Sequence, residues 1–245
     1  TKEMYSWEDV DGASLTLRPE LTASVVRSYI QHNLGTLSPI QRLYYSGPLF
    51  RRERPQKGRQ RQFHQFGIEA FGSNNPEQDV EIIAIAWKIL SLCGLANDTT
   101  LNLNSIGSNE CRNNYRTALK NYLSPYIKDF SKTSQHRFDT NPLRILDTKS
   151  EKEQEILNDA PKISDYHNET DRTHFESLKE FLKDMGLPFS INHKLVRGLD
   201  YYTGTVFEFN SDNLGAQDAL LGGGRYNRLV ETLGGKPTPG IGFAA

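Results

Sequence analysis

The most distinctive chemistry in the sequence lies in a basic segment between residues 51 and 61. Six basic residues stand there against one acid, Glu53, although the whole chain has a formal net charge of −1. Arginine side chains offer paired N–H donors that match phosphate oxygens, so this segment could hold a polyphosphate or the end of a nucleic acid. A solvated charged turn is the alternative that composition alone leaves open. The basic residues are Arg51, Arg52, Arg54, Lys57, Arg59 and Arg61.

The next ten residues, 62–71, alternate in a pattern that predicts a β-strand. Phe66, Ile68 and Ala70 fall on a face that can pack on a core. The opposite face extends about 20 Å from Phe63 to Glu69, which is long enough for a base joined to a smaller group. A solvent-exposed polar face is the commoner arrangement in antiparallel sheets and stays open. The opposite face carries Phe63, Gln65, Gly67, Glu69 and Phe71.

Other elements are needed to position this loop and strand. An apolar periodicity after Pro19 predicts a helix that continues to Asn33. A second helix is predicted to begin at Pro76, with acidic residues in its first turn, and to end before Gly94. Short strands are predicted over residues 41–46, 49–54 and 101–106.

The order of these patterns predicts the domain organisation. Strand patterns at both ends of the chain flank a polar stretch, rich in lysine and asparagine, with helical periodicity. We therefore expect an α+β fold whose core is interrupted by an inserted helical domain. The first part of the core is expected at residues 1–108, the inserted domain at 109–186 and the second part of the core at 187–245.

Composition excludes several classes of protein. The near-zero net charge argues against a globally basic nucleic-acid coat, and no apolar stretch is long enough to span a membrane. The two cysteines form no CxxC pair, and the six histidines show no spacing typical of metal ligands, so we expect no zinc site. The chain begins at Thr1, and residues 239–245 look like the start of a buried element. We therefore expect a fragment of a longer protein.

Four segments together resemble one family, the histidyl-tRNA synthetases of the class II aminoacyl-tRNA synthetases. Residues 50–55 (FRRERP) with 61–69 (RQFHQFGIE) resemble motif 2 of that class. Residues 16–20 (TLRPE) resemble the histidine-binding segment of the family. Residues 195–208 (LVRGLDYYTGTVFE) and 222–226 (GGGRY) resemble its two histidine-specific signatures. The resemblance implies an antiparallel sheet flanked by helices, an inserted helical domain, a homodimer and a cytoplasmic location, without a membrane.

The implied reaction joins L-histidine to ATP as histidyl-adenylate and then transfers histidine to the 3′ end of tRNA(His). Negative charge builds on the α-phosphate, so fixed cations aimed there lower the barrier. By similarity, Arg51 and Arg197 are the catalytic cations, and Arg197 has a role that class II relatives more often give to a metal. Glu53 would contact adenine, Arg59 the terminal phosphates, and Phe63 would stack on adenine. Mg²⁺ would arrive with ATP.

The resemblance also implies a histidine pocket. An α-ammonium group needs anionic or carbonyl acceptors, and a neutral imidazole needs one partner for each ring nitrogen. Buried polar groups that a wrong side chain leaves unpaired can give strong discrimination. The implied set is Glu20, Thr22 and Gln65 for the ammonium group, Glu69 and Tyr202 for the ring nitrogens, Tyr201 and Tyr226 as lining, and Arg51 and Arg197.

The sequence departs from the family pattern in places. Leu21 stands where the family usually has glycine, and Arg52 where histidine is frequent. Motif 1, which forms the family's dimer interface, is not visible. The motif 3 arginine would fall after Ala245, as would the anticodon-binding domain. By analogy, residues 109–186 would contact the acceptor arm of the tRNA.

Two alternatives share the fold without the reaction. One is the synthetase-like regulatory subunit of ATP phosphoribosyltransferase, which senses histidine and does not charge tRNA. The other is the synthetase-like domain of a stress-sensing kinase, which binds tRNA without catalysis. The first would be expected to lose the basic residues of motif 2 and the catalytic arginine, whereas this sequence keeps Arg51, Arg59 and Arg197. The second would be expected to lose the histidine-binding residues, which are present.

Overall fold

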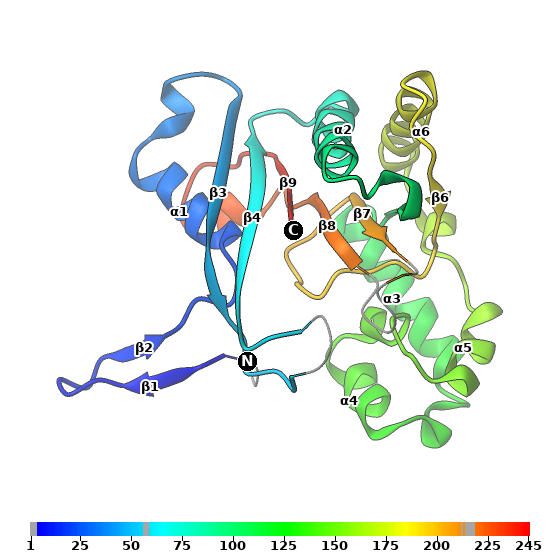
Figure 1. Cartoon of the computed structure of the whole chain (residues 1–245). Helices are drawn as coiled ribbons and strands as arrows, with labels where there is room; N and C mark the ends of the chain where they lie inside the picture. The colour runs from blue at the N-terminus through cyan, green and yellow to red at the C-terminus, as the bar shows by residue number, and fades with distance from the viewer. Residues whose placement is uncertain (1–3, 56–58, 212, 214–218) are drawn as a thin grey trace.

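The centre of the molecule is a seven-stranded sheet with the strand order β3-β4-β9-β8-β7-β5-β6 (Figure 1). All neighbouring strands run antiparallel except β5 and β6, which are parallel. The computed structural model describes residues 4–55, 59–211, 213 and 219–245. The predicted α+β class, with a mainly antiparallel sheet flanked by helices, is confirmed. The strands are β3 (Gln41–Phe50), β4 (Gln62–Phe71), β5 (Thr100–Ser105), β6 (Ser190–Ile191), β7 (Thr205–Asn210), β8 (Ala219–Arg225) and β9 (Gly240–Ala244).

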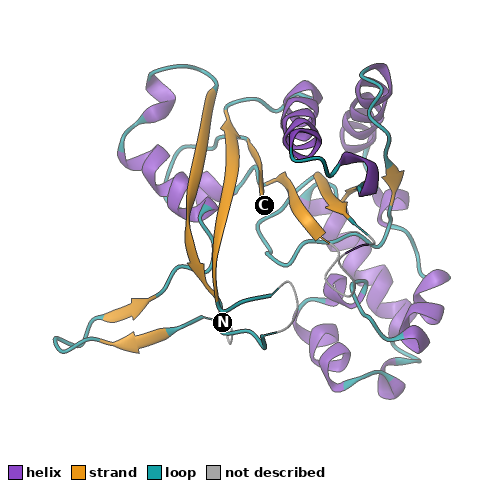
Figure 2. Ribbon diagram, in the orientation of Figure 1, coloured by secondary structure: helices purple, strands orange, loops and turns teal. Residues whose placement is uncertain are grey.

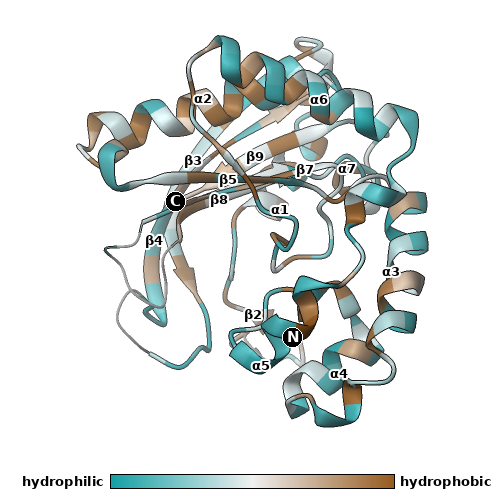
Figure 3. Cartoon of the chain, turned by 90° about the vertical axis from the view of Figure 1, so that its right-hand side faces the viewer, coloured by the Kyte–Doolittle hydropathy of each residue, from teal (hydrophilic) through white to brown (hydrophobic). Residues whose placement is uncertain are grey.

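Helices cover both faces of the sheet (Figures 1 and 3). On one face, α2 (Pro76–Leu92) and α6 (Glu169–Asp184) lie side by side, and Ile83 and Leu178 pack with Phe207 of β7 in one buried cluster. On the other face, α1 (Thr22–Gln31) contacts α7 (Leu229–Thr232). Val26 of α1 and Phe71 of β4 belong there to a second buried cluster, which continues into the helices that follow β5.

A helical block, residues 109–166, adjoins this second cluster (Figure 2). Tyr115, Leu143 and Leu157 of the block belong to the same buried cluster as Phe71 of the sheet. By contrast, α6 packs on α2 over the opposite face. The boundaries of an inserted domain at residues 109 and 186 stay a prediction. The block contains α3 (Asn109–Leu123), η3 (Ile127–Asp129), α4 (Lys132–Thr140), η4 (Pro142–Ile145), α5 (Glu151–Asn158) and η5 (Ile163–Tyr166).

Some elements differ from the sequence predictions. The two strands predicted at residues 41–46 and 49–54 are one strand, β3, that passes through Pro48 and ends at Phe50. Because β3 is an edge strand, proline is tolerated there. The first helix begins at Thr22, three residues after Pro19, because the side chain of Glu20 accepts the backbone N–H of Ala23. A hairpin of β1 (Ser6–Glu8) and β2 (Ser14–Thr16), which the sequence patterns did not predict, extends from the body (Figure 1).

A buried ion pair ties the sheet to its helices. Arg225 of β8 and Asp79 of α2 are both about fully buried, and Arg225 Nε lies 2.7 Å from Asp79 Oδ1. Thr205 of β7 donates to Asp79 Oδ2 at 3.0 Å, and the ring of His174 on α6 contacts the same oxygen. The guanidinium of Arg225 also donates to two backbone carbonyls in the turn before α2. One carboxylate thus joins β7, β8, α2 and α6. In the described residues, no helix combines the length and apolar composition that crossing a bilayer requires.

Replacing this carboxylate should destabilise the fold strongly. Asp79→Asn removes the negative charge but leaves the guanidinium of Arg225 buried, and a broken buried pair typically costs about 3–5 kcal/mol. We expect a loss of this size in the free energy of unfolding, measured by urea denaturation. Glu176→Gln, which breaks the exposed Lys179–Glu176 pair of α6, is the control and should cost less than about 1 kcal/mol. Equal losses in the two variants would contradict a structural role for Asp79.

Candidate functional site

A cavity of about 130 Å³ lies on the face of the sheet opposite α2 and α6. All nine residues of the predicted histidine set line it, although they come from five separate stretches of the chain. The structure therefore brings this set together, and its binding role stays a prediction. Leu199, Gly222, Gly242, Phe243 and Ala244 complete the wall. The nine predicted residues are Glu20, Thr22, Arg51, Gln65, Glu69, Arg197, Tyr201, Tyr202 and Tyr226.

The position of each side chain follows from its element. In β4, the alternation of a strand directs Gln65 and Glu69 to the cavity and Ala70 to the cluster beneath α2. Glu20 and Thr22 stand at the beginning of α1. The other members lie just outside strands: Arg51 follows β3, Tyr226 follows β8, and Arg197, Tyr201 and Tyr202 lie between β6 and β7.

Glu69 is the most strongly perturbed acid in the cavity. Its side chain is about fully buried, and burial raises the pKa of its carboxyl to about 8 from the ordinary 4.5. Hydrogen bonds from Tyr226 and Thr22 oppose this shift, and the charge of Glu20 adds to it. Thr22 Oγ1 donates to Glu69 Oε1 at 2.7 Å, and the hydroxyl of Tyr226 donates to Oε2. Near neutral pH, Glu69 can therefore either accept or donate a hydrogen bond.

Glu20 and Arg51 also line the cavity, and opposing effects act on the pKa of Glu20. Burial raises the pKa of Glu20, whereas the backbone N–H groups of residues 22 and 23 and the charge of Arg51 lower it. Arg51 Nε donates to the carbonyl oxygen of Pro19 at 2.9 Å, and its guanidinium carbon lies 4.8 Å from the centre of the Phe63 ring. Arg51 is therefore held by both the segment before α1 and the beginning of β4.

Three of the four predicted ATP contacts, Glu53, Arg59 and Phe63, do not line this cavity. Arg59 Nε pairs with Glu53 Oε2 at 2.7 Å, and Arg61 donates to the carbonyl oxygen of Glu53. Phe63 carries the guanidinium of Arg51 against its ring, whereas the resemblance implied adenine there. Of this set, Arg51 alone lines the cavity. Lys57, which contributes to the basic segment, lies outside the described residues. The ATP roles of Arg51, Glu53, Arg59 and Phe63 stay predictions.

Arg197 is held on three sides. Its guanidinium pairs with the carboxylate of Glu208 on β7, and its central carbon lies 5.9 Å from the centre of the Tyr202 ring. The third side is Gly222 of β8, where any Cβ atom would overlap the guanidinium. Glu208 lies within a signature motif but has no predicted role. Its signal was present in the alternation of β7, because Val206 and Glu208 share a face while Phe207 and Phe209 point to the opposite cluster.

Glycines provide the floor of the cavity. Gly242 of β9 is paired in the ladder with Glu69 of β4, and a Cβ atom at Gly242 would overlap the Glu69 carboxylate. In the same way, the absence of a side chain at Gly222 leaves room for the guanidinium of Arg197. The glycines of residues 222–224 belong to a signature motif, whereas no sequence pattern predicted a role for Gly242. Only the pairing of β4 with β9 reveals why a side chain is absent there.

Three tyrosines close the cavity. The rings of Tyr201 and Tyr202 have centroids 4.8 Å apart, and Tyr226 meets Tyr201 edge-on at 5.8 Å. Burial is the main cause that raises the pKa of each of the three hydroxyls. They therefore stay protonated near neutral pH and remain available as hydrogen-bond donors.

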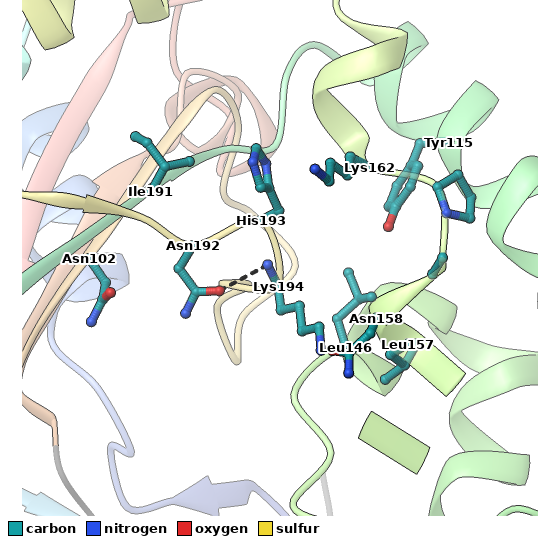
Figure 4. A pocket seen from close by; sticks show the side chains of 12 residues that line it. Asn102, Tyr115, Leu146, Leu157, Asn158, Lys162, Ile191, Asn192, His193 and Lys194 are labelled. Atoms are coloured by element: carbon teal, nitrogen blue, oxygen red, sulfur yellow. Dashed lines mark hydrogen bonds between the residues drawn. The ribbon is translucent and has the colours of Figure 1, made fainter. Parts of the chain in front are cut away.

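Two larger cavities lie between the sheet edge and the helical block. The first cavity, of about 350 Å³, is lined by Asn102 of β5 and Tyr115 of α3, together with Lys162, His193 and other residues (Figure 4). It contains none of the predicted site residues. The second, of about 390 Å³, shares Asn102 with the first and reaches Arg197. In the described part of the chain, no group of three His, Cys, Asp or Glu side chains is placed to hold a metal ion.

Comparisons with known proteins agree on one family. The family model described as histidyl-tRNA synthetase matches residues 1–245. A histidine–tRNA ligase of Cyanothece sp. is 54% identical over 243 residues, 99% of this chain and 56% of that protein. One from Protochlamydia amoebophila is 51% identical over 243 residues, 99% of this chain and 57% of that protein. The crystal structure of apo S. aureus histidyl-tRNA synthetase aligns with a TM-score of 0.76 at 42% identity, covering 98% of this chain and 58% of that one. The chain thus spans little more than half the length of these relatives.

The raised pKa of Glu69 should appear in the pH dependence of stability. Between pH 4.5 and about 8, the folded protein keeps a proton on Glu69 that the unfolded chain releases. The free energy of unfolding should therefore fall as pH rises through this range. In Glu69→Gln, which cannot titrate, this part of the fall should disappear in urea denaturation at a series of pH values. Glu81→Gln is the control, because Arg42 lowers the pKa of Glu81 and its titration lies below this range. An identical slope in wild type and Glu69→Gln would refute the shift.

A methyl group at Gly242 should damage the cavity. Because the Cβ of Gly242→Ala would overlap the Glu69 carboxylate, either the strand or the carboxylate must move. Overpacking of this kind typically costs about 1–3 kcal/mol, which urea denaturation should detect. Gly198→Ala, where no atom lies within 4 Å of the added carbon, is the control and should change stability by less than about 1 kcal/mol. A Gly242→Ala protein as stable as the control would show that the floor tolerates a side chain.

Proposed function

The chain belongs to the histidyl-tRNA synthetase family, and from this premise we propose that it forms the catalytic part of a histidine–tRNA ligase. The enzyme would join L-histidine to tRNA(His) with ATP as the second substrate. One observation carries the proposal: nine residues from five separate stretches, implied as a histidine set by sequence, line a single small cavity. The proposal extends to a cytoplasmic homodimer.

Histidine recognition would use the polar ends of this cavity. Glu20, Thr22 and Gln65 offer acceptors to the α-ammonium group. Glu69 would contact one ring nitrogen of the imidazole and Tyr202 the other, because a neutral ring carries one donor and one acceptor. A side chain without ring nitrogens would leave the buried carboxyl of Glu69 without that partner, at a cost that can reject it strongly.

Activation would proceed by attack of a histidine carboxylate oxygen on the α-phosphorus of ATP. The new bond joins that oxygen to phosphorus, the bond from the α-phosphorus to the bridging oxygen breaks, and diphosphate leaves with Mg²⁺ brought by ATP. Arg51 and Arg197 both face the cavity and would stabilise the charge on the α-phosphate. The pair with Glu208 fixes the guanidinium of Arg197 before the substrates arrive, so little reorganisation is needed.

Transfer would complete the reaction at the 3′ end of the tRNA. A ribose hydroxyl attacks the carbonyl carbon of histidyl-adenylate, an ester bond forms, and AMP leaves. The predicted domain at residues 109–186 would contact the acceptor arm of the tRNA. Arg59 and Glu53 would meet the terminal phosphates and the adenine of ATP once their mutual pair opens.

The regulatory alternative makes a different use of the same cavity. A histidine sensor needs the histidine set and has no need for cations at a phosphate. Arg51 and Arg197 line the cavity and Arg59 pairs beside it, which favours the ligase. The alternative is therefore an outcome of the experiment below.

Histidine-dependent exchange between ATP and diphosphate tests the proposal on the complete protein. We expect exchange with histidine and not with a panel of other amino acids. Arg197→Ala should lower the exchange rate by about a hundredfold or more, since it removes one fixed cation at the phosphate. Arg27→Ala, an exposed arginine of α1, should leave it unchanged. Saturable histidine binding without exchange would refute the ligase and favour the regulatory subunit.

A further inference from the structure

The segment between β6 and β7 carries four of the cavity residues, Arg197, Leu199, Tyr201 and Tyr202. It contacts the sheet through Leu195, whose carbonyl oxygen accepts from Asn104 of β5, through the Arg197–Glu208 pair, and at its end, where Thr203 N donates to the carbonyl oxygen of Arg225 at 2.7 Å. Residues 198–202 lie outside the strands, and two of them hydrogen-bond to the helical block. The positions of Tyr201 and Tyr202 must therefore depend partly on contacts with the block.

Arg112 of α3 makes the first contact from the block. Its Nη1 donates to the backbone carbonyl oxygen of Tyr202 at 2.6 Å, and its Nη2 donates to the side chain of Asn109. Burial lowers the pKa of Arg112, and the charges of Arg116 and Arg228 lower it further. The negative charge of Asp200 acts in the opposite direction, and the guanidinium of this half-buried arginine is directed at the backbone of Tyr202.

Asn141, at the junction of α4 and η4, makes the second contact. Its Nδ2 donates to Asp200 Oδ1 at 2.5 Å. The two contacts fall on either side of Tyr201 and come from different parts of the block. Leu195 and Tyr202 also belong to the same buried cluster as Leu146 of the block.

We propose that Arg112 and Asn141 are positioning residues for histidine, through which the helical block sets the place of Tyr201 and Tyr202. The inference rests on the proposed function, because it assumes that histidine occupies the cavity. The proposal also predicts different effects on the binding of the two substrates, histidine and ATP. The guanidinium of Arg197, on the same segment, contacts the Tyr202 ring but is also held by Glu208 and Gly222 of the sheet, so loss of the block contacts should weaken histidine binding much more than ATP binding.

The test compares histidine and ATP kinetics in variants of the complete protein. Arg112→Met keeps an unbranched apolar side chain in place of the arginine stem but removes the N–H donors of the guanidinium. It should raise the KM for histidine about tenfold, because hydrogen bonds from charged groups are the strong ones. The KM for ATP and kcat should stay within about twofold. Arg112→Lys should restore part of the histidine affinity, and Arg116→Met, an exposed arginine on the same helix, is the control.

Asn141→Ala provides a second variant should Arg112→Met fail to fold. It removes only the contact with Asp200 and should raise the KM for histidine about threefold to tenfold. Calorimetric titration with histidine gives the same comparison without turnover. Unchanged histidine affinity in both variants, while wild type is active, would overturn the inference. Equal rises in both KM values with a lower melting temperature would also overturn it, since that is a general structural effect. Absence of exchange in wild type would instead refute the proposed function.

Discussion

The buried carboxyl of Glu69 is the constraint from which the rest of the site follows. An acid on the face of a central strand is stable there only if its oxygens find partners and no side chain crowds it. Thr22 at the start of α1 and Tyr226 after β8 supply the partners. Gly242, opposite in the ladder, supplies the space. One side chain thus sets requirements on a helix, a turn and a neighbouring strand.

Strand β8 contributes residues to both faces of the sheet. In β8, Gly222 leaves room for Arg197 on the cavity side, whereas Arg225 points to the other side and pairs with Asp79 beneath α2. Tyr226, one residue later, returns to the cavity. Successive residues of the run GGGRY therefore alternate between the two faces of the sheet. The buried pair with Asp79 fixes the strand against α2 and α6, so the glycine floor has a rigid support.

Sequence patterns predicted the features that depend on residues close together in the chain. The bounds of β4 were predicted from its alternation, and residues of the cavity were named from motifs whose spacing lies within one segment. Other features depend on partners far away in sequence. The two strands predicted at residues 41–46 and 49–54 are one strand, because an edge strand accepts Pro48, and the need for glycine at position 242 follows only from its pairing with Glu69. The contact of Arg112 with the backbone of Tyr202 bridges ninety residues and has no signature in the sequence of either segment.

The balance of charge in the cavity fits the zwitterion that the proposed reaction would bind. With the pKa of Glu69 raised to about 8, its carboxyl is largely neutral at pH 7. Arg197 is compensated by Glu208, which leaves on the cavity wall Arg51 and Glu20, whose charged form Arg51 and two backbone N–H groups favour against burial. An amino acid carries the complementary pair on its ammonium and carboxylate groups. Its entry would therefore bury no net charge, and the cost of desolvation would be met by direct pairing. A second fixed negative charge at Glu69 would break this balance, which is a physical reason for keeping that acid buried.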